Sequence, residues 1–274
     1  MQVGFIGTGS MGRILIEAFI EANALLPSQV YASNRTFEKV KELAKTYTGL
    51  HAYPANTRVV QKADLLFLCV KPLEFKTVID EIVPYVRDEQ MIVSITSPVE
   101  IKDLEKQLTA KIAKIIPSIT NSVRGGASLM VAGSRLSERD KDLLFHLMQS
   151  ISQPLWIDER FTRVSSDIVS CGPAILSYLA QRMIDAAVRE TGIPKRQATL
   201  LMNYMLSGFG DLLSTHKFTL ETLQERVCVP GGVTGEALKV LEEEIGDMFA
   251  SMFRQTHRKF EEDVHEVYET FYSR

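Results

Sequence analysis

The sequence of 274 residues predicts an α/β domain built on a parallel sheet, followed by an all-helical domain. Three observations lead to this prediction. Residues 2–6 form a short apolar strand that continues into a GxGxxG motif at residues 7–12 and then into a helical stretch at 13–21. Residues 64–70 are a continuous apolar run, which is typical of a strand buried on both faces of a parallel sheet. From residue 161 onward, apolar residues recur only at helical spacing.

Each glycine of the motif has a separate physical role. Gly7 lets the chain turn, Gly9 lets a pyrophosphate approach the backbone, and Gly12 lets the helix pack against the strand. Free N–H groups at the start of that helix would bind the phosphates at the positive end of the helix dipole. The same spacing also occurs in ordinary strand-to-helix turns, so the flanking strand and helix are what favour a dinucleotide site. The N-terminal part is therefore predicted to be a Rossmann-type dinucleotide-binding domain.

Strands and helices alternate through the rest of this domain. Strands are expected at residues 29–32, near 51, and at 64–70, 91–95, 111–116 and, as the last strand, 127–132. Helices are expected between them at residues 37–46, 56–62, 74–83, 99–108 and 137–150. The pattern changes near residues 156–158, which places a Rossmann domain at 1–157 and a helical domain at 158–274.

The end of the second strand, Ser33-Asn34-Arg35, bears on the choice of cofactor. An acidic residue at this position would bind the ribose 2′-hydroxyl of NAD, whereas a hydroxyl, an amide and a guanidinium can hold the 2′-phosphate of NADP. The first acidic residue after the strand is Glu38. The segment also reads as a polar turn in which Thr36 caps the next helix, and both roles are compatible. The pattern favours NADP.

Composition excludes several other classes of function. The formal net charge of −3 offers no basic surface for nucleic acid or anionic membranes. No apolar run approaches the ~20 residues of a membrane span and no signal peptide is recognisable, so we expect a cytoplasmic protein. The three cysteines Cys69, Cys171 and Cys228 are far apart, which indicates reduced thiols. The histidines form no HExxH motif, and we expect no metal.

Four motifs span nearly the whole chain. They are Gly7-x-Gly9-x-Met11-Gly12, residues 64–72 ending in Val70-Lys71-Pro72, Gly172-Pro173-Ala174, and Pro230-Gly231-Gly232-x-Thr234. In this order and at these separations they resemble the pyrroline-5-carboxylate reductase family, and within it the reductase-like late competence proteins of the ComER type. The Pro-Gly-Gly-x-Thr element inside an all-helical domain is the most specific of the four.

The resemblance implies a Rossmann domain that binds NADPH and an all-α dimerisation domain, with the active site formed between two subunits of a homodimer or of a higher assembly of dimers. It implies hydride transfer to the C=N carbon of a cyclic imino acid, which yields proline. It assigns cofactor binding to Gly7, Thr8, Gly9, Ser10, Met11, Gly12, Ser33, Asn34, Arg35, Asn56, Val70, Lys71 and Pro72. It assigns the hydrogen bond to the ring nitrogen to Thr234, as the catalytic residue, and substrate binding to Val229, Gly231, Gly232, Val233 and Thr234.

The substrate half departs from the family pattern. Val229 replaces a serine, and Ser118 stands where the family motif has asparagine. A lost hydrogen bond to a charged group costs about 1.5–3 kcal/mol, which weakens binding by about one to two orders of magnitude. A non-catalytic NADP-binding regulatory protein is therefore an alternative. A β-hydroxyacid dehydrogenase is a second alternative, although residues 170–182 lack the lysine that would serve as its proton donor.

Overall fold

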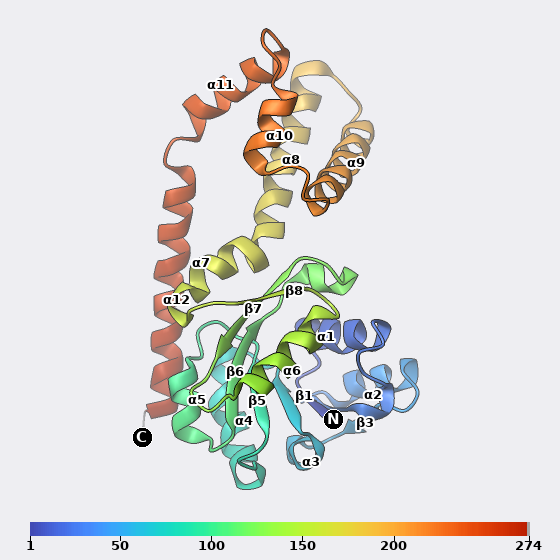
Figure 1. The fold of residues 1–274 in the computed structure, drawn as a ribbon, viewed down its shortest axis with the longest axis vertical. Coiled ribbons are helices and arrows are strands. Elements are labelled where there is room, and N and C mark those ends of the chain that lie inside the picture. The colour runs from blue at the N-terminus through green and yellow to red at the C-terminus, as the bar shows by residue number, and fades with distance from the viewer. Residues whose placement is uncertain (273–274) are drawn as a thin grey trace. The chain divides into compact units, whose positions relative to one another are not determined.

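The computed structural model describes residues 1–272 and divides into two compact units (Figure 1). The first unit comprises residues 1–173 together with the chain from Gln255 onward, and the second comprises residues 174–254. These units differ from the predicted domain ranges 1–157 and 158–274. The difference arises because α12 (Met248–Tyr272) buries Val267 and Phe271 in the core of the first unit. The domain boundary near residue 158 itself stays a prediction.

Within the described residues, the first unit is built on an eight-stranded sheet with the order β3-β2-β1-β4-β5-β6-β7-β8. The strands are β1 Val3–Ile6, β2 Val30–Ser33, β3 His51–Tyr53, β4 Leu65–Leu68, β5 Met91–Ser94, β6 Lys111–Ile116, β7 Ala127–Ala132 and β8 Gln153–Trp156. All neighbouring pairs are parallel except β6 with β7. The chain leaves β1 toward β2 on one side and returns to β4 on the other, so the topological switch point lies between β1 and β4.

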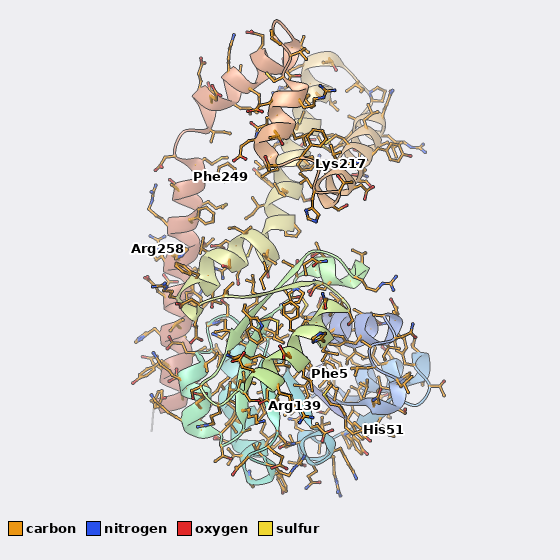
Figure 2. All side chains as sticks on the ribbon, in the orientation of Figure 1. Phe5, His51, Arg139, Lys217, Phe249 and Arg258 are labelled. Atoms are coloured by element: carbon orange, nitrogen blue, oxygen red, sulfur yellow. The ribbon has the colours of Figure 1, made fainter. Side chains whose placement is uncertain are left out.

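Helices cover both faces of the sheet, as Figure 1 shows. They are α1 Ser10–Glu21, α2 Phe37–Thr46, α3 Asn56–Lys62, α4 Phe75–Ile82, α5 Ile101–Gln107, α6 Glu138–Gln149 and the short α7 Thr162–Ser166. The core on one face includes Phe5, whose ring stacks on Phe67 at a centroid distance of 5.0 Å (Figure 2). The core on the other face includes Ile79 and Leu104. Burying both faces explains why β4 reads as an uninterrupted apolar run.

The expectation that residues 127–132 form the last strand was wrong. The strand β8 pairs in parallel with β7 and forms one edge of the sheet. Its composition hides it from sequence analysis, because it contains Pro154. Proline cannot donate a hydrogen bond to a neighbouring strand and is therefore confined to edge positions, where the sequence signal of a strand is weak.

The second unit is entirely helical, as predicted. It contains α8 (Gly172–Thr191) from Ala174 onward, α9 (Lys195–Ser214), α10 (Leu220–Val227), α11 (Val233–Ile245) and the first turns of α12. Among residues 174–254, Ile184 and Ala198 are the buried ones. Large apolar side chains stay exposed on every helix, among them Leu176, Met183, Leu201, Tyr204, Leu241 and Phe249 (Figure 2). This unit therefore buries little apolar surface by itself.

Candidate active site

In the turn from β1 to α1, an added Cβ atom would clash with the backbone at two of the three glycines and would meet no atom at the third. A Cβ atom at Gly7, whose φ is +97°, would lie 2.5 Å from the carbonyl oxygen of Cys69. A Cβ atom at Gly12 would lie 2.1 Å from the carbonyl oxygen of Gly7. Nothing lies within 4 Å of the corresponding position at Gly9. Gly7 and Gly12 thus allow internal close packing, whereas Gly9 leaves the backbone accessible to a ligand.

Polar groups without partners surround the open glycine. The helix α1 begins at Ser10 with Gly9 as its N-cap, and within residues 1–272 no side chain accepts a hydrogen bond from its first N–H groups. The buried hydroxyl of Thr8 also has no partner among the described residues. The backbone N–H of Thr8 donates to Oδ1 of Asn34 at 3.0 Å, which anchors the turn to the end of β2. Free helical N–H groups and an unpaired buried hydroxyl fit a phosphate-bearing cofactor.

The segment Ser33–Arg35, predicted to hold the 2′-phosphate, divides into buried and exposed parts. Ser33 is buried, and its hydroxyl donates to Oδ1 of Asn56 at 2.7 Å. Nδ2 of Asn56 in turn donates to Glu81 at 2.7 Å. Ser33 therefore orients Asn56 from inside the domain. Arg35 is 87% exposed and is the cation of the segment, with Nη1 donating to Oε1 of Glu74 at 2.8 Å.

A cavity of about 440 Å³ adjoins the glycine turn. It lies at the carboxyl ends of β4, β5 and β6, and its walls are mainly apolar. The lining residues are Gly9, Ser10, Met11, Cys69, Val70, Lys71, Ile95, Thr96, Ile116, Pro117 and Ser170. Lys71 supplies a positive charge. Burial raises the pKa of the Cys69 thiol, which favours its neutral form.

The structure therefore brings Gly9, Ser10, Met11, Val70 and Lys71 together around one cavity, as the sequence predicts. Sequence reasoning did not assign Cys69, Ile95, Thr96, Ile116, Pro117 and Ser170 to the site. The first five lie at or just beyond the carboxyl ends of β4, β5 and β6, and the rule that ligands lie at the carboxyl ends of parallel strands would have found them. Ser170, just before the Gly172-Pro173-Ala174 motif, is held there by a hydrogen bond from its hydroxyl to the carbonyl of Pro117 at 2.9 Å.

The residues predicted to bind substrate belong to the second unit. Gly232 is the N-cap of α11, whose first N–H groups have no side-chain acceptor in the described part of the chain. The N–H of Gly232 donates to the carbonyl of Val229 at 2.9 Å, and Gly231 has a φ of +74°, which favours glycine. Thr234 is half-buried in the first turn of α11, and Val229 is 59% exposed. The free N–H groups of this helix start can receive a carboxylate.

The described residues contain no group of three or more His, Cys, Asp or Glu residues that could hold a metal ion. None of their helices has the length and apolar character that crossing a membrane requires.

Comparison with known sequence families gives two matches. Residues 159–263 match the family described as "Pyrroline-5-carboxylate reductase dimerisation", and residues 2–98 match "NADP oxidoreductase coenzyme F420-dependent". Among curated relatives, ComE operon protein 4 of Bacillus subtilis is 47% identical over 99% of this chain and 100% of its own length. Pyrroline-5-carboxylate reductase 3 of Bacillus subtilis is 30% identical over 95% of this chain and 96% of its own length.

Solved structures agree with this assignment of the fold. A pyrroline-5-carboxylate reductase from Coxiella burnetii superposes with a TM-score of 0.83 at 25% identity, covering 98% of both chains. The Plasmodium falciparum pyrroline carboxylate reductase, solved with NADP bound, gives a TM-score of 0.81 at 21% identity, covering 97% of this chain and 98% of that one. The predicted fold class, a Rossmann-type domain followed by a helical dimerisation region, is confirmed.

Proposed function

Because the chain belongs to the pyrroline-5-carboxylate reductase family, we propose that it is an NADP-dependent oxidoreductase that reduces the C=N bond of pyrroline-5-carboxylate or a close analogue. The observation that carries this proposal is the open backbone at Gly9, next to an apolar cavity at the carboxyl ends of the central strands. Such a cavity is where a doubly wound sheet holds a dinucleotide.

The choice of NADP over NAD is supported by the exposed Arg35 at the end of β2. A guanidinium binds phosphate oxygens in a bidentate manner. The Plasmodium falciparum enzyme of the same fold was solved with NADP bound, which is consistent with this choice. Asn34, beside Arg35, fixes the conformation of the segment: its Oδ1 accepts the N–H of Thr8 at 3.0 Å, and its Nδ2 donates to the carbonyl of Thr36 at 3.1 Å.

The proposed mechanism asks little of the side chains. NADPH supplies the hydride when bound, and a protonated imine is already an electrophile. The first N–H groups of α1 and the hydroxyl of Thr8 hold the pyrophosphate. Apolar walls such as Val70 and Ile95 exclude water from the cavity. On the second unit, Thr234 hydrogen-bonds the ring nitrogen, and the free N–H groups at the start of α11 bind the substrate carboxylate.

A non-catalytic NADP-binding regulator is a second candidate, and two observations favour it. Val229 places an exposed apolar side chain where a hydroxyl would help to hold the carboxylate. Ser118 is buried, and its hydroxyl donates to the carbonyl of Val169 at 3.0 Å, so it serves the fold and offers nothing to a substrate. Both observations argue against tight substrate binding, and neither concerns the residues proposed to bind the cofactor.

Steady-state oxidation of NADPH in the presence of pyrroline-5-carboxylate separates the two candidates. We expect measurable turnover with a high KM, and a lower KM in Val229→Ser because a lost hydrogen bond is restored. Thr234→Val should lower kcat/KM by leaving the ring nitrogen unpaired. NADPH binding without turnover, in both the parent and Val229→Ser, would establish the regulatory candidate instead. β-Hydroxyacids with NADP serve as the control substrates and should give no turnover.

A further inference from the structure

An ion pair crosses the switch point of the sheet. Arg35 follows β2, and Glu74 ends the 3₁₀ turn η2 (Pro72–Glu74) that follows β4. The strands β2 and β4 flank β1 on its two sides. The bond from Nη1 of Arg35 to Oε1 of Glu74, at 2.8 Å, therefore joins the two segments that border the carboxyl end of β1, where the glycine turn begins.

We propose that Glu74 is a specificity-determining residue for the cofactor, because its carboxylate competes with the ribose 2′-phosphate for Arg35. This inference rests on the proposed function, since it requires a dinucleotide on the turn from β1 to α1. A guanidinium pairs with a carboxylate or a phosphate through the same planar set of donors. One arginine cannot present that set fully to both anions.

NADP and NAD would interact differently with the Arg35–Glu74 pair. The 2′-phosphate of NADP carries about −1.5 to −2 charges at neutral pH, so it must displace Glu74 from Arg35 and then lies near a free carboxylate. The 2′-hydroxyl of NAD is a donor, and a carboxylate at the end of this crevice can accept its hydrogen bond. Glu74 therefore reduces the preference for NADP that Arg35 alone would create.

Exposure limits the size of the effect. The side chains of Arg35 and Glu74 are 87% and 38% exposed, and exposed pairs are weak and screened by salt. We therefore expect a change of about three- to tenfold in Kd rather than a complete block. Glu81, a further carboxylate near this end of the site, accepts a hydrogen bond from Nδ2 of Asn56 at 2.7 Å.

The test is calorimetric titration of NADPH and NADH into the full chain, Glu74→Gln and a control variant. The control is Asp80→Asn on α4, which removes one carboxylate and the exposed pair with Lys76 while leaving Arg35 and Glu74 in place. Glu74→Gln should bind NADPH about three- to tenfold more tightly and NADH no more tightly than the parent. Asp80→Asn should change both affinities by less than about twofold.

A second pair of variants tests the competition itself. The gain from Glu74→Gln should shrink in an Arg35→Ala background, where no guanidinium is left to release. An unchanged ratio of NADPH to NADH affinity in Glu74→Gln, the same gain in Asp80→Asn, or an undiminished gain without Arg35 would overturn the proposal. If one of these results occurs while the unmodified chain still binds NADPH and reduces the imine, the competition is refuted and the proposed function stands. A parent that binds neither dinucleotide refutes both.

Discussion

Lys114 is a lysine inside the sheet, and only 1% of its side chain is exposed. Its ammonium donates to Glu159 at 2.7 Å and to the carbonyl of Ser97 at 3.1 Å. Burial lowers the pKa of Lys114, and the attraction of Glu159 opposes that shift. The same oxygen of Glu159 accepts the N–H of Ile101 at 3.1 Å. The pair therefore links the segment after β5, which lines the cavity beside the glycine turn, to the segment after β8.

Glu159→Gln should lower the stability of the first unit because it leaves a buried ammonium without its anion. Breaking a fully buried pair costs about 3–5 kcal/mol, and the 34% exposure of Glu159 reduces this to about 1–3 kcal/mol. Urea unfolding followed by the fluorescence of Trp156, the single tryptophan, measures it. Glu89→Gln, which removes the exposed partner of Arg87, is the control and should leave the urea midpoint of unfolding close to that of the parent. Equal costs in both variants would show that burial of Lys114 does not matter.

The glycine turn is the element whose function the sequence predicts most fully. The spacing of the motif, the strand before it and the helix after it are all local, so their geometry follows from the chain itself. Contacts between distant segments were not predictable in this way. The pairing of Arg35 with Glu74 spans 39 positions, and the bond of Ser170 to Pro117 spans 53. The sequence therefore predicted the cation at the end of β2 but not the carboxylate that holds it.

Local sequence patterns also failed to predict two details of the helices. The helix α11 begins at Val233, directly after its N-cap Gly232, a start that no sequence pattern above indicates. Residues 167–171, just before Gly172, form a π-helical segment that no periodicity indicated. In this segment the chain stays helical, and only its hydrogen-bond register changes.

Alanine substitutions at two glycines of the turn should have opposite consequences. Gly9→Ala should keep the thermal stability of the parent but weaken NADPH binding, since its Cβ meets no protein atom and occupies the approach of the pyrophosphate. Gly12→Ala should unfold at a lower temperature, because its Cβ would lie 2.1 Å from the carbonyl oxygen of Gly7 and would force α1 away from β1. Thermal unfolding and NADPH titration of both variants measure this difference. Parent-like affinity in Gly9→Ala would mean that the pyrophosphate does not lie at this turn.

At the scale of the whole molecule, the helical unit requires a partner surface. Its helices leave large apolar side chains exposed, and residues 159–263 match a family named for dimerisation. We expect light scattering at micromolar concentration to give at least twice the chain mass of 30.8 kDa, with no monomer. A stable, folded monomer at this concentration would contradict the expectation, because it would leave this apolar surface exposed to water.

The proposed reaction is a hydride transfer from NADPH to a cyclic imine. It can be followed with NADPH deuterated at the transferable position, with pyrroline-5-carboxylate as the acceptor and mass spectrometry of the product. We expect one deuterium at Cδ of the proline formed, and a loss of this product in Gly9→Ala, which weakens the proposed cofactor site. NADPH that binds to the full chain while proline stays absent or unlabelled would contradict the proposed reaction.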